Sequence, residues 1–139
     1  MDLYDTLLFL HVLSAALAVG ALASLWALII GTRPGGSLLG PGPAARYGLV
    51  AGTLVGVGMM GALVFGIWLA IHVDSYELWD GWILGSLIVW MIAGSAGGAA
   101  GRAYAEDPVG KRSSAMRLHV VSSVGVVVIL ALMIWKPGA

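Results

Sequence analysis

Histidine has the widest chemical repertoire in this sequence, because imidazole can bind metals, ligate haem iron and transfer protons near neutral pH. It occurs three times. The first, His11, lies within a long apolar run, where an imidazole is costly unless it is hydrogen-bonded or coordinated. Leu7, Ala15 and Ala18 share its helical face and leave room beside it for a bulky, flat ligand. We therefore expect His11 either to hydrogen-bond to a neighbouring helix or to ligate haem or a metal.

His72 begins a run of metal-ligating residue types that continues with Asp74, Glu77 and Asp80. Carboxylate and imidazole groups suit hard or borderline divalent ions, so these four residues are candidate metal ligands. Their spacing matches no established metal site. The alternative interpretation is therefore a solvated loop that carries ordinary interfacial charges.

His11 and His72 are the two histidines expected on the same side of the molecule, so they are the candidate cofactor-binding residues, with haem as the candidate cofactor. Ligation by two imidazoles requires both rings to face each other across the iron. A dimer would instead supply a second His11 at the same depth. His119 lies near Arg117 on the opposite side and is interpreted as interfacial. No nucleophile–base arrangement or phosphate-binding loop is recognisable, so no catalytic residue is assigned.

Four apolar runs carry or flank these histidines, over about residues 4–30, 47–72, 81–103 and 116–135, and each is long enough for a transmembrane helix. The composition, 60% hydrophobic and 10% charged, excludes an ordinary soluble domain. Seven Lys and Arg balance seven Asp and Glu, which excludes a nucleic-acid-binding module. The runs are too long and continuous for barrel strands. We predict an all-α, polytopic membrane protein: one domain over residues 1–139, a bundle of four transmembrane helices with short loops.

The basic residues predict the orientation of this bundle. Six of them lie in or beside the connections after the first and third runs: Arg33, Arg46, Arg102, Lys111, Arg112 and Arg117. Because basic residues collect on the cytoplasmic side, we expect both termini outside, in a multi-pass protein of the bacterial cytoplasmic (inner) membrane. Five acids and one base then lie outside, a net charge of −4, and six bases and two acids lie inside, a net charge of +4.

Glycine is abundant, with 21 residues, and small residues at four-residue spacing let membrane helices approach closely. In the second run they form two series separated by a step of two residues, which turns the stripe by about 200° around the helix. The candidate packing residues are Gly48, Gly52, Gly56, Gly58, Gly66, Gly94 and Gly98. These glycines either hold the bundle together or, on one face, form a homodimer interface.

The apolar runs carry no acidic or basic residue deep within them, which weighs against an ion-coupled transporter. We expect a non-catalytic bundle that acts as a small subunit or assembly factor of a larger membrane complex, or as a homo-oligomer. One alternative is a haem- or metal-associated redox membrane protein that uses His11. Another is an oligomeric channel or transporter for a small solute. The expected partners are the lipid bilayer, further copies of the chain or other membrane subunits, and no nucleic acid.

The order of several short motifs resembles a bacterial family of four-helix integral membrane proteins without an assigned function. The motifs are Leu8–Leu13, Gly66-x-Trp68, Trp79-x-x-Trp82-Ile83 and Leu132–Pro137, spread over most of the chain. The opening Leu10-His11-Val12 is more distantly similar to the CopD type of copper-resistance proteins and to the HemJ-type protoporphyrinogen oxidases. In the HemJ type a histidine early in the first helix ligates haem, and His11 matches that position. The chain lacks the mid-membrane lysine or arginine of that type and a copper-binding cluster rich in methionine or histidine.

Overall fold

The computed structural model describes residues 2–33, 36–37, 40–72 and 79–136. Within these ranges the chain forms four helices: α1 (Leu3–Gly31), α2 (Pro41–His72), α3 (Gly81–Glu106) and α4 (Arg112–Trp135). Two short strands, β1 (Thr32–Arg33) and β2 (Gly36–Ser37), pair antiparallel between α1 and α2. All four helices are long and apolar enough to cross a membrane. The predicted all-α bundle of four membrane-spanning helices is therefore confirmed.

Two helices begin earlier than their apolar runs. α2 begins at Pro41, whereas the apolar run predicted for it begins near residue 47. Pro41 and Pro43 are tolerated there because the first-turn amides of a helix have no intrahelical acceptor, so the missing proline N–H costs nothing. α4 begins at Arg112, because the polar residues that precede Met116 are also compatible with helical structure.

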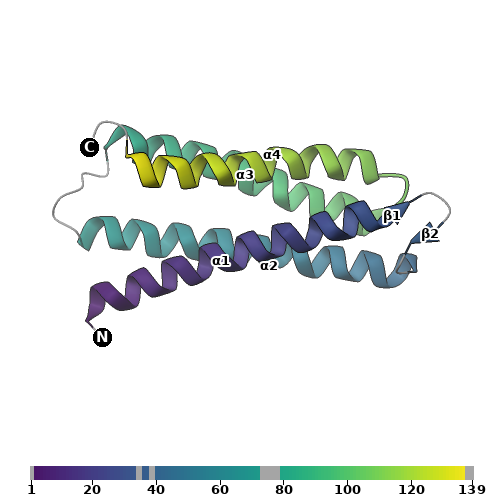
Figure 1. The fold of residues 1–139 in the computed structure, drawn as a ribbon, viewed down its shortest axis with the longest axis horizontal. Coiled ribbons are helices and arrows are strands. Elements are labelled where there is room, and N and C mark those ends of the chain that lie inside the picture. The colour runs from purple at the N-terminus through teal and green to yellow at the C-terminus, as the bar shows by residue number, and fades with distance from the viewer. Residues whose placement is uncertain (1, 34–35, 38–39, 73–78, 137–139) are drawn as a thin grey trace.

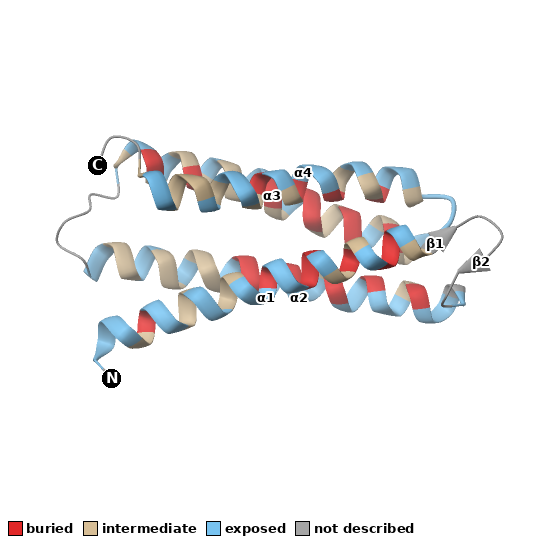
Figure 2. Ribbon diagram, viewed as in Figure 1, coloured by how far each residue is buried: buried red, intermediate tan, exposed pale blue. Residues whose placement is uncertain are grey.

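The helices form two antiparallel hairpins, α1 with α2 and α3 with α4 (Figure 1). One end of the bundle holds Leu3, His72, Gly81 and Trp135, and we call it the termini end. The other holds Gly31, Pro41, Glu106 and Arg112, and we call it the basic end because most of the arginines lie near it. Buried residues concentrate in the middle and toward the basic end, whereas the termini end is mostly exposed or half-buried (Figure 2).

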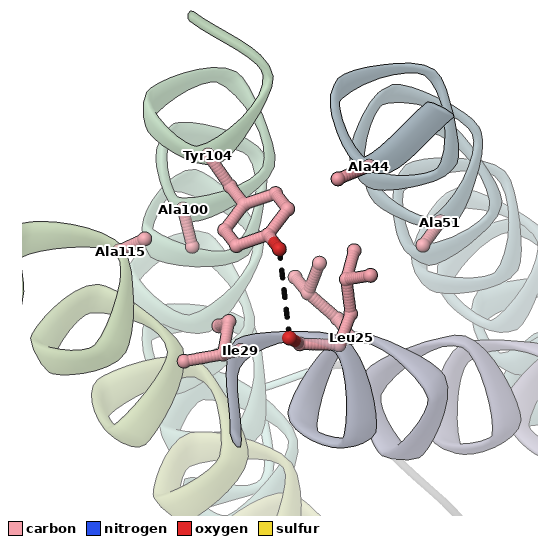
Figure 3. Close-up of a cluster of buried hydrophobic side chains, with 8 residues drawn as sticks. Leu25, Ile29, Ala44, Ala51, Ala100, Tyr104 and Ala115 are labelled. Atoms are coloured by element: carbon pink, nitrogen blue, oxygen red, sulfur yellow. Dashed lines mark hydrogen bonds between the residues drawn. The ribbon is translucent and has the colours of Figure 1, made fainter. Parts of the chain in front are cut away.

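The hydrophobic core near the basic end is built around Tyr104 of α3, which is fully buried. Its hydroxyl donates a hydrogen bond of 3.5 Å to the backbone carbonyl of Leu28 in α1 (Figure 3). Small and branched side chains from all four helices surround it: Leu25, Leu28, Ile29, Ala44, Ala51, Ala100 and Ala115. The two hairpins are closely packed here because most of the residues opposite the tyrosine ring are alanines.

The glycines of α2 contact a different helix in each half of α2. A Cβ atom on Gly48 would lie 2.7 Å from the ring of Tyr104, and one on Gly52 would lie 3.2 Å from the Cα of Gly101, both on α3. A Cβ on Gly58 would lie 2.6 Å from the backbone of Ala18, on α1. The change of partner follows the two-residue step between the glycine series, which rotates the small-residue stripe around the helix.

Three of the candidate packing glycines do not pack against another helix. A Cβ at Gly56 or Gly94 would meet no atom within 4 Å, and one at Gly98 would meet only the guanidinium of Arg102 on its own helix. These positions therefore contribute nothing to helix contacts within one chain. Four-residue spacing identifies a stripe of small residues, but each stripe has neighbours on only part of its length.

The connection between α3 and α4 is ordered by Asp107, whose Oδ1 accepts hydrogen bonds from the backbone amides of Val109 (3.2 Å) and Gly110 (2.8 Å). Lys111 donates a hydrogen bond to the Glu106 carboxylate, and this bond raises the pKa of Lys111. Arg112 Nε donates a 2.9 Å bond to the carbonyl of Ile29 at the end of α1. The last carbonyls of a helix lack intrahelical donors, so this arginine satisfies one of them.

Candidate functional site

A cavity of about 570 Å³ lies between the four helices at the termini end. Its wall is mostly aliphatic and contains few polar groups. The polar and aromatic residues that line it are Tyr4, His11, Trp82, Ser86, Trp90 and Lys136. Trp82 and Trp90 contribute two bulky rings to this wall from α3, whereas the small residues Gly97, Ala100 and Gly101 of α3 are buried further toward the basic end.

His11 is half-buried in the cavity wall, and its Nδ1 lies 2.9 Å from the backbone carbonyl of Ala62 on α2. A carbonyl only accepts hydrogen bonds, so Nδ1 is the protonated nitrogen and Nε2 of the neutral ring carries a lone pair. Gly66 makes room for the ring, because a Cβ there would lie 2.9 Å from His11 Cε1. The imidazole is thus oriented by α2 and keeps one nitrogen able to accept a hydrogen bond or coordinate a metal.

Ser86 is another residue of the cavity wall, and its hydroxyl is buried. The residue is 7% exposed, and its Oγ has no hydrogen-bond partner in the part of the chain that the structure describes. A buried hydroxyl without a partner costs on the order of 1–3 kcal/mol. Such a group is uncommon in folded proteins, and its Oγ atom has almost no accessible surface of its own, so it does not face the open part of the cavity.

The two tryptophans position α3 against its neighbours. Trp90 Nε1 donates a 2.9 Å hydrogen bond to the carbonyl of Met59 on α2. The ring of Trp82 lies with its centroid 5.9 Å from the Nζ atom of Lys136, which follows α4. A cation at this distance from an indole face is attracted to it. Trp90 therefore tethers the two hairpins beside the cavity, and Lys136 places a positive charge at its rim.

The remaining candidate ligands are not assembled into a site. His72 is exposed at the end of α2 and is not among the residues that line the cavity, so it does not face His11 across it. Asp74 and Glu77 lie outside the described residues, and Asp80 immediately precedes α3. Within the described ranges, no group of three or more His, Asp and Glu side chains could hold a metal ion.

His119 is fully buried, which corrects its interpretation as an interfacial residue. Its Nε2 donates a 2.9 Å hydrogen bond to the carbonyl of Leu22 on α1, and its ring lies 4.9 Å from that of Trp26. The early start of α4 places His119 about two turns inside the helix. A signal was present in the sequence, because His119 shares its helical face with the small residues Ser122 and Gly125, which are also buried.

Comparisons with protein-family models, with curated proteins and with solved structures gave no match for this chain. The titratable groups in the cavity wall are Tyr4, His11 and Lys136. His11 Nδ1 is occupied by Ala62 and the Lys136 ammonium lies over Trp82. This wall can enclose an apolar molecule and offer it a few hydrogen bonds, which is the chemistry of a binding site.

Proposed function

We propose that this protein binds a lipid-like molecule in the cavity at the termini end of its membrane-spanning bundle and does not itself catalyse a reaction. The observation that carries this proposal is a cavity of about 570 Å³ whose mostly apolar wall is drawn from all four helices. Its volume lies within the roughly 300–1,000 Å³ of typical small-molecule sites. An apolar chain in this space would contact both hairpins at once.

The charge distribution supports an orientation for this site. Arg46, Arg102, Lys111 and Arg117 are exposed toward the basic end, whereas Asp2 and Asp5 lie at the termini end. Under the positive-inside rule, the cavity belongs to the outer leaflet of a bacterial inner membrane, with both termini outside. The chain has no cysteine. A single Asp2→Cys variant should therefore react with a membrane-impermeant thiol reagent in intact cells, and a Lys111→Cys variant should react only after lysis.

The binding proposal is tested by filling the cavity. Ala15 lines the cavity, and its neighbour Ala16 is exposed on the outside of α1. Native mass spectrometry of protein purified in mild detergent should detect a retained lipid-like mass on the wild type and on Ala16→Phe. Ala15→Phe should lose it. Equal retention by the two variants, or no retained molecule on the wild type after incubation with membrane lipids, would contradict the proposal.

A second candidate function is haem binding through His11, and one observation favours it. His11 Nδ1 donates to the Ala62 carbonyl, which is the hydrogen bond that orients an imidazole for coordination through Nε2. The cavity could accommodate a flat ligand beside the ring, with His11 as the one imidazole in the wall. Bound haem would supply redox chemistry. A Soret band in the purified protein that is lost in His11→Ala but kept in His72→Ala would establish this function, and colourless protein would exclude it.

We also propose that the chain acts as a small subunit or assembly factor of a larger membrane complex, or as a homo-oligomer. The open positions at Gly20, Gly56 and Gly94 support it, because a neighbouring helix could approach the backbone closely there. A channel or transporter for a small solute would need several copies of the chain, since the core around Tyr104 fills the bundle near the basic end. Molecular mass in detergent by light scattering distinguishes a monomer from either assembly.

A further inference from the structure

We propose that the ligand of this cavity is a neutral lipid whose hydroxyl group donates a hydrogen bond to Nε2 of His11. The inference rests on the proposed binding function and specifies the chemistry of the ligand. Lipid tails are as apolar as the cavity wall, so moving an alkyl chain from the bilayer into the cavity gains little free energy. Selectivity for a ligand must therefore come from a polar atom of the wall that the ligand can reach.

Most polar side-chain atoms of the cavity wall are not available to a ligand below the membrane surface. The Nε1 atom of Trp90 already donates to a backbone carbonyl of α2. The Nε1 atom of Trp82 and the Oγ atom of Ser86 each have less than 1 Å² of accessible surface. Tyr4 and Lys136 lie at the ends of α1 and α4, where water and lipid headgroups can reach them. One further wall residue in the described part of the chain has a polar side chain.

This residue is His11, and its Nε2 atom is available. Nδ1 lies 2.9 Å from the carbonyl of Ala62, so Nδ1 carries the proton and Nε2 is an acceptor. A Cβ at Gly66 would lie 2.9 Å from Cε1 and 3.1 Å from Nδ1, so this edge of the ring packs on α2. Nε2 has no hydrogen-bond partner among the residues that the structure describes and, unlike the sealed atoms of Trp82 and Ser86, it retains accessible surface.

The depth of His11 restricts the charge of the ligand group. It lies eight residues from the start of α1, which at about 1.5 Å per residue is roughly 12 Å from the helix end. A ligand group that reaches Nε2 therefore leaves the headgroup region. A phosphate or carboxylate would be buried there as a charge and would face a lone pair, which is strongly unfavourable. A neutral polar group has a much smaller desolvation cost.

The acceptor character of Nε2 selects among neutral groups. A hydroxyl can donate a hydrogen bond to it, whereas ether, ester and ketone oxygens can only accept, and an alkene can do neither. An acceptor-only oxygen beside Nε2 would place two lone pairs against each other and leave the desolvation of both uncompensated. The hydroxyl is therefore the simplest lipid group that complements this wall.

The proposal is tested with two probes that share one chain, oleyl alcohol and oleyl methyl ether, and differ in the donor hydrogen. The full-length protein in detergent is incubated with an equimolar mixture and passed through a sizing column, and the retained probes are quantified relative to protein-free micelles. We expect the alcohol to be enriched about two- to tenfold over the ether, as one hydrogen bond would produce. His11→Phe keeps a flat ring without an acceptor and should abolish the enrichment. His72→Phe is the matched control, because His72 is exposed and does not line the cavity.

A second measurement uses the wild type and does not depend on the folding of a variant at His11. The chain has three histidines, so 15N-histidine labelling gives few ring-nitrogen resonances. His72→Phe and His119→Leu identify the resonances of the other two rings. The Nε2 resonance of His11 should shift when oleyl alcohol is added and stay in place with the ether, because an unprotonated ring nitrogen changes its chemical shift when it accepts a hydrogen bond.

The outcomes separate the ligand class from the binding function. Equal retention of alcohol and ether, the same enrichment in His11→Phe and His72→Phe, or an Nε2 resonance insensitive to retained alcohol would overturn the hydroxyl proposal and leave binding intact. A Soret band that is lost in His11→Phe would also overturn it, because iron would then occupy Nε2. Retention of neither probe above the level in protein-free micelles, or retention unaffected by Ala15→Phe, would refute the binding function itself.

Discussion

The Nε2 atom of His119 donates a hydrogen bond of 2.9 Å to the backbone carbonyl of Leu22, which joins the last helix to the first in the buried interior. Trp26 packs its ring against the imidazole and donates from Nε1 to Ser123 Oγ at 3.0 Å. Ser123 in turn donates to the carbonyl of His119 at 2.8 Å. This polar group lies between the core around Tyr104 and the cavity, so it holds the two hairpins together where the bundle begins to open.

Replacing His119 by leucine should destabilise the bundle. Leucine fills most of the imidazole volume, so the main loss is the bond to Leu22. Interhelical hydrogen bonds in membrane proteins contribute about 0.6 kcal/mol on average and up to about 1.7. We expect a loss of about 0.6–1.7 kcal/mol in the free energy of unfolding, measured by titration with SDS in mixed micelles. His72→Leu, on an exposed residue, should leave that free energy unchanged, and an equal effect of both substitutions would contradict the buried role.

Replacing Gly52 by leucine should separate α2 from α3. A Cβ there would lie 3.2 Å from the Cα of Gly101, a backbone atom that can give way only if the two helices shift apart. Overpacking of this kind costs about 1–3 kcal/mol or more. Gly56→Leu, one turn further along α2, meets no atom within 4 Å and should instead gain up to about 1 kcal/mol from higher helix propensity. The two substitutions should therefore change the free energy of unfolding in opposite directions, and SDS unfolding of both variants measures these changes.

The sequence sufficed to predict the class of fold and part of the packing. Apolar runs of membrane-spanning length predict four helices because a bilayer leaves few other structures available. The two-residue step between Gly56 and Gly58 also predicts that α2 turns its small-residue stripe, and the structure shows that stripe contacting α3 in one half and α1 in the other. Local spacing determines both features, so no knowledge of the neighbouring helices is needed.

The partners of the polar side chains could not be predicted in the same way. That His11 bonds to Ala62, and His119 to Leu22, depends on which backbone carbonyl of another helix lies opposite each ring. Helix crossing angles and axial shifts determine that choice, and they depend on the packing of many side chains together. Ser86 illustrates the same limit, because nothing in its neighbours along the chain indicates that its hydroxyl is buried without a partner.

Trp90→Phe should weaken the contact between the hairpins beside the cavity. Phenylalanine keeps most of the ring but loses the 2.9 Å bond from Nε1 to the Met59 carbonyl. A hydrogen bond of this kind contributes about 0.5–1.5 kcal/mol. The free energy of unfolding should fall by that amount, and the variant should retain less of the proposed lipid-like ligand because α3 is no longer fixed against α2. Trp135→Phe is the control, since Trp135 is 80% exposed. Equal free energies of unfolding for the two variants would show that the bond from Trp90 to Met59 does not stabilise the bundle.

Arg112→Ala should loosen the basic end of the bundle. Arg112 Nε donates a 2.9 Å bond to Ile29, one of the last carbonyls of α1, which has no donor within its own helix. The arginine is half-buried, so water can replace part of the interaction, and we expect a loss of about 1 kcal/mol in the free energy of unfolding. Amide hydrogen exchange should increase in the last turn of α1 and the first turn of α4. Arg117→Ala removes the same charge from an exposed position on α4 and should change neither quantity. Faster exchange in both variants would show that net charge at this end, and not the bond to Ile29, stabilises the helix termini.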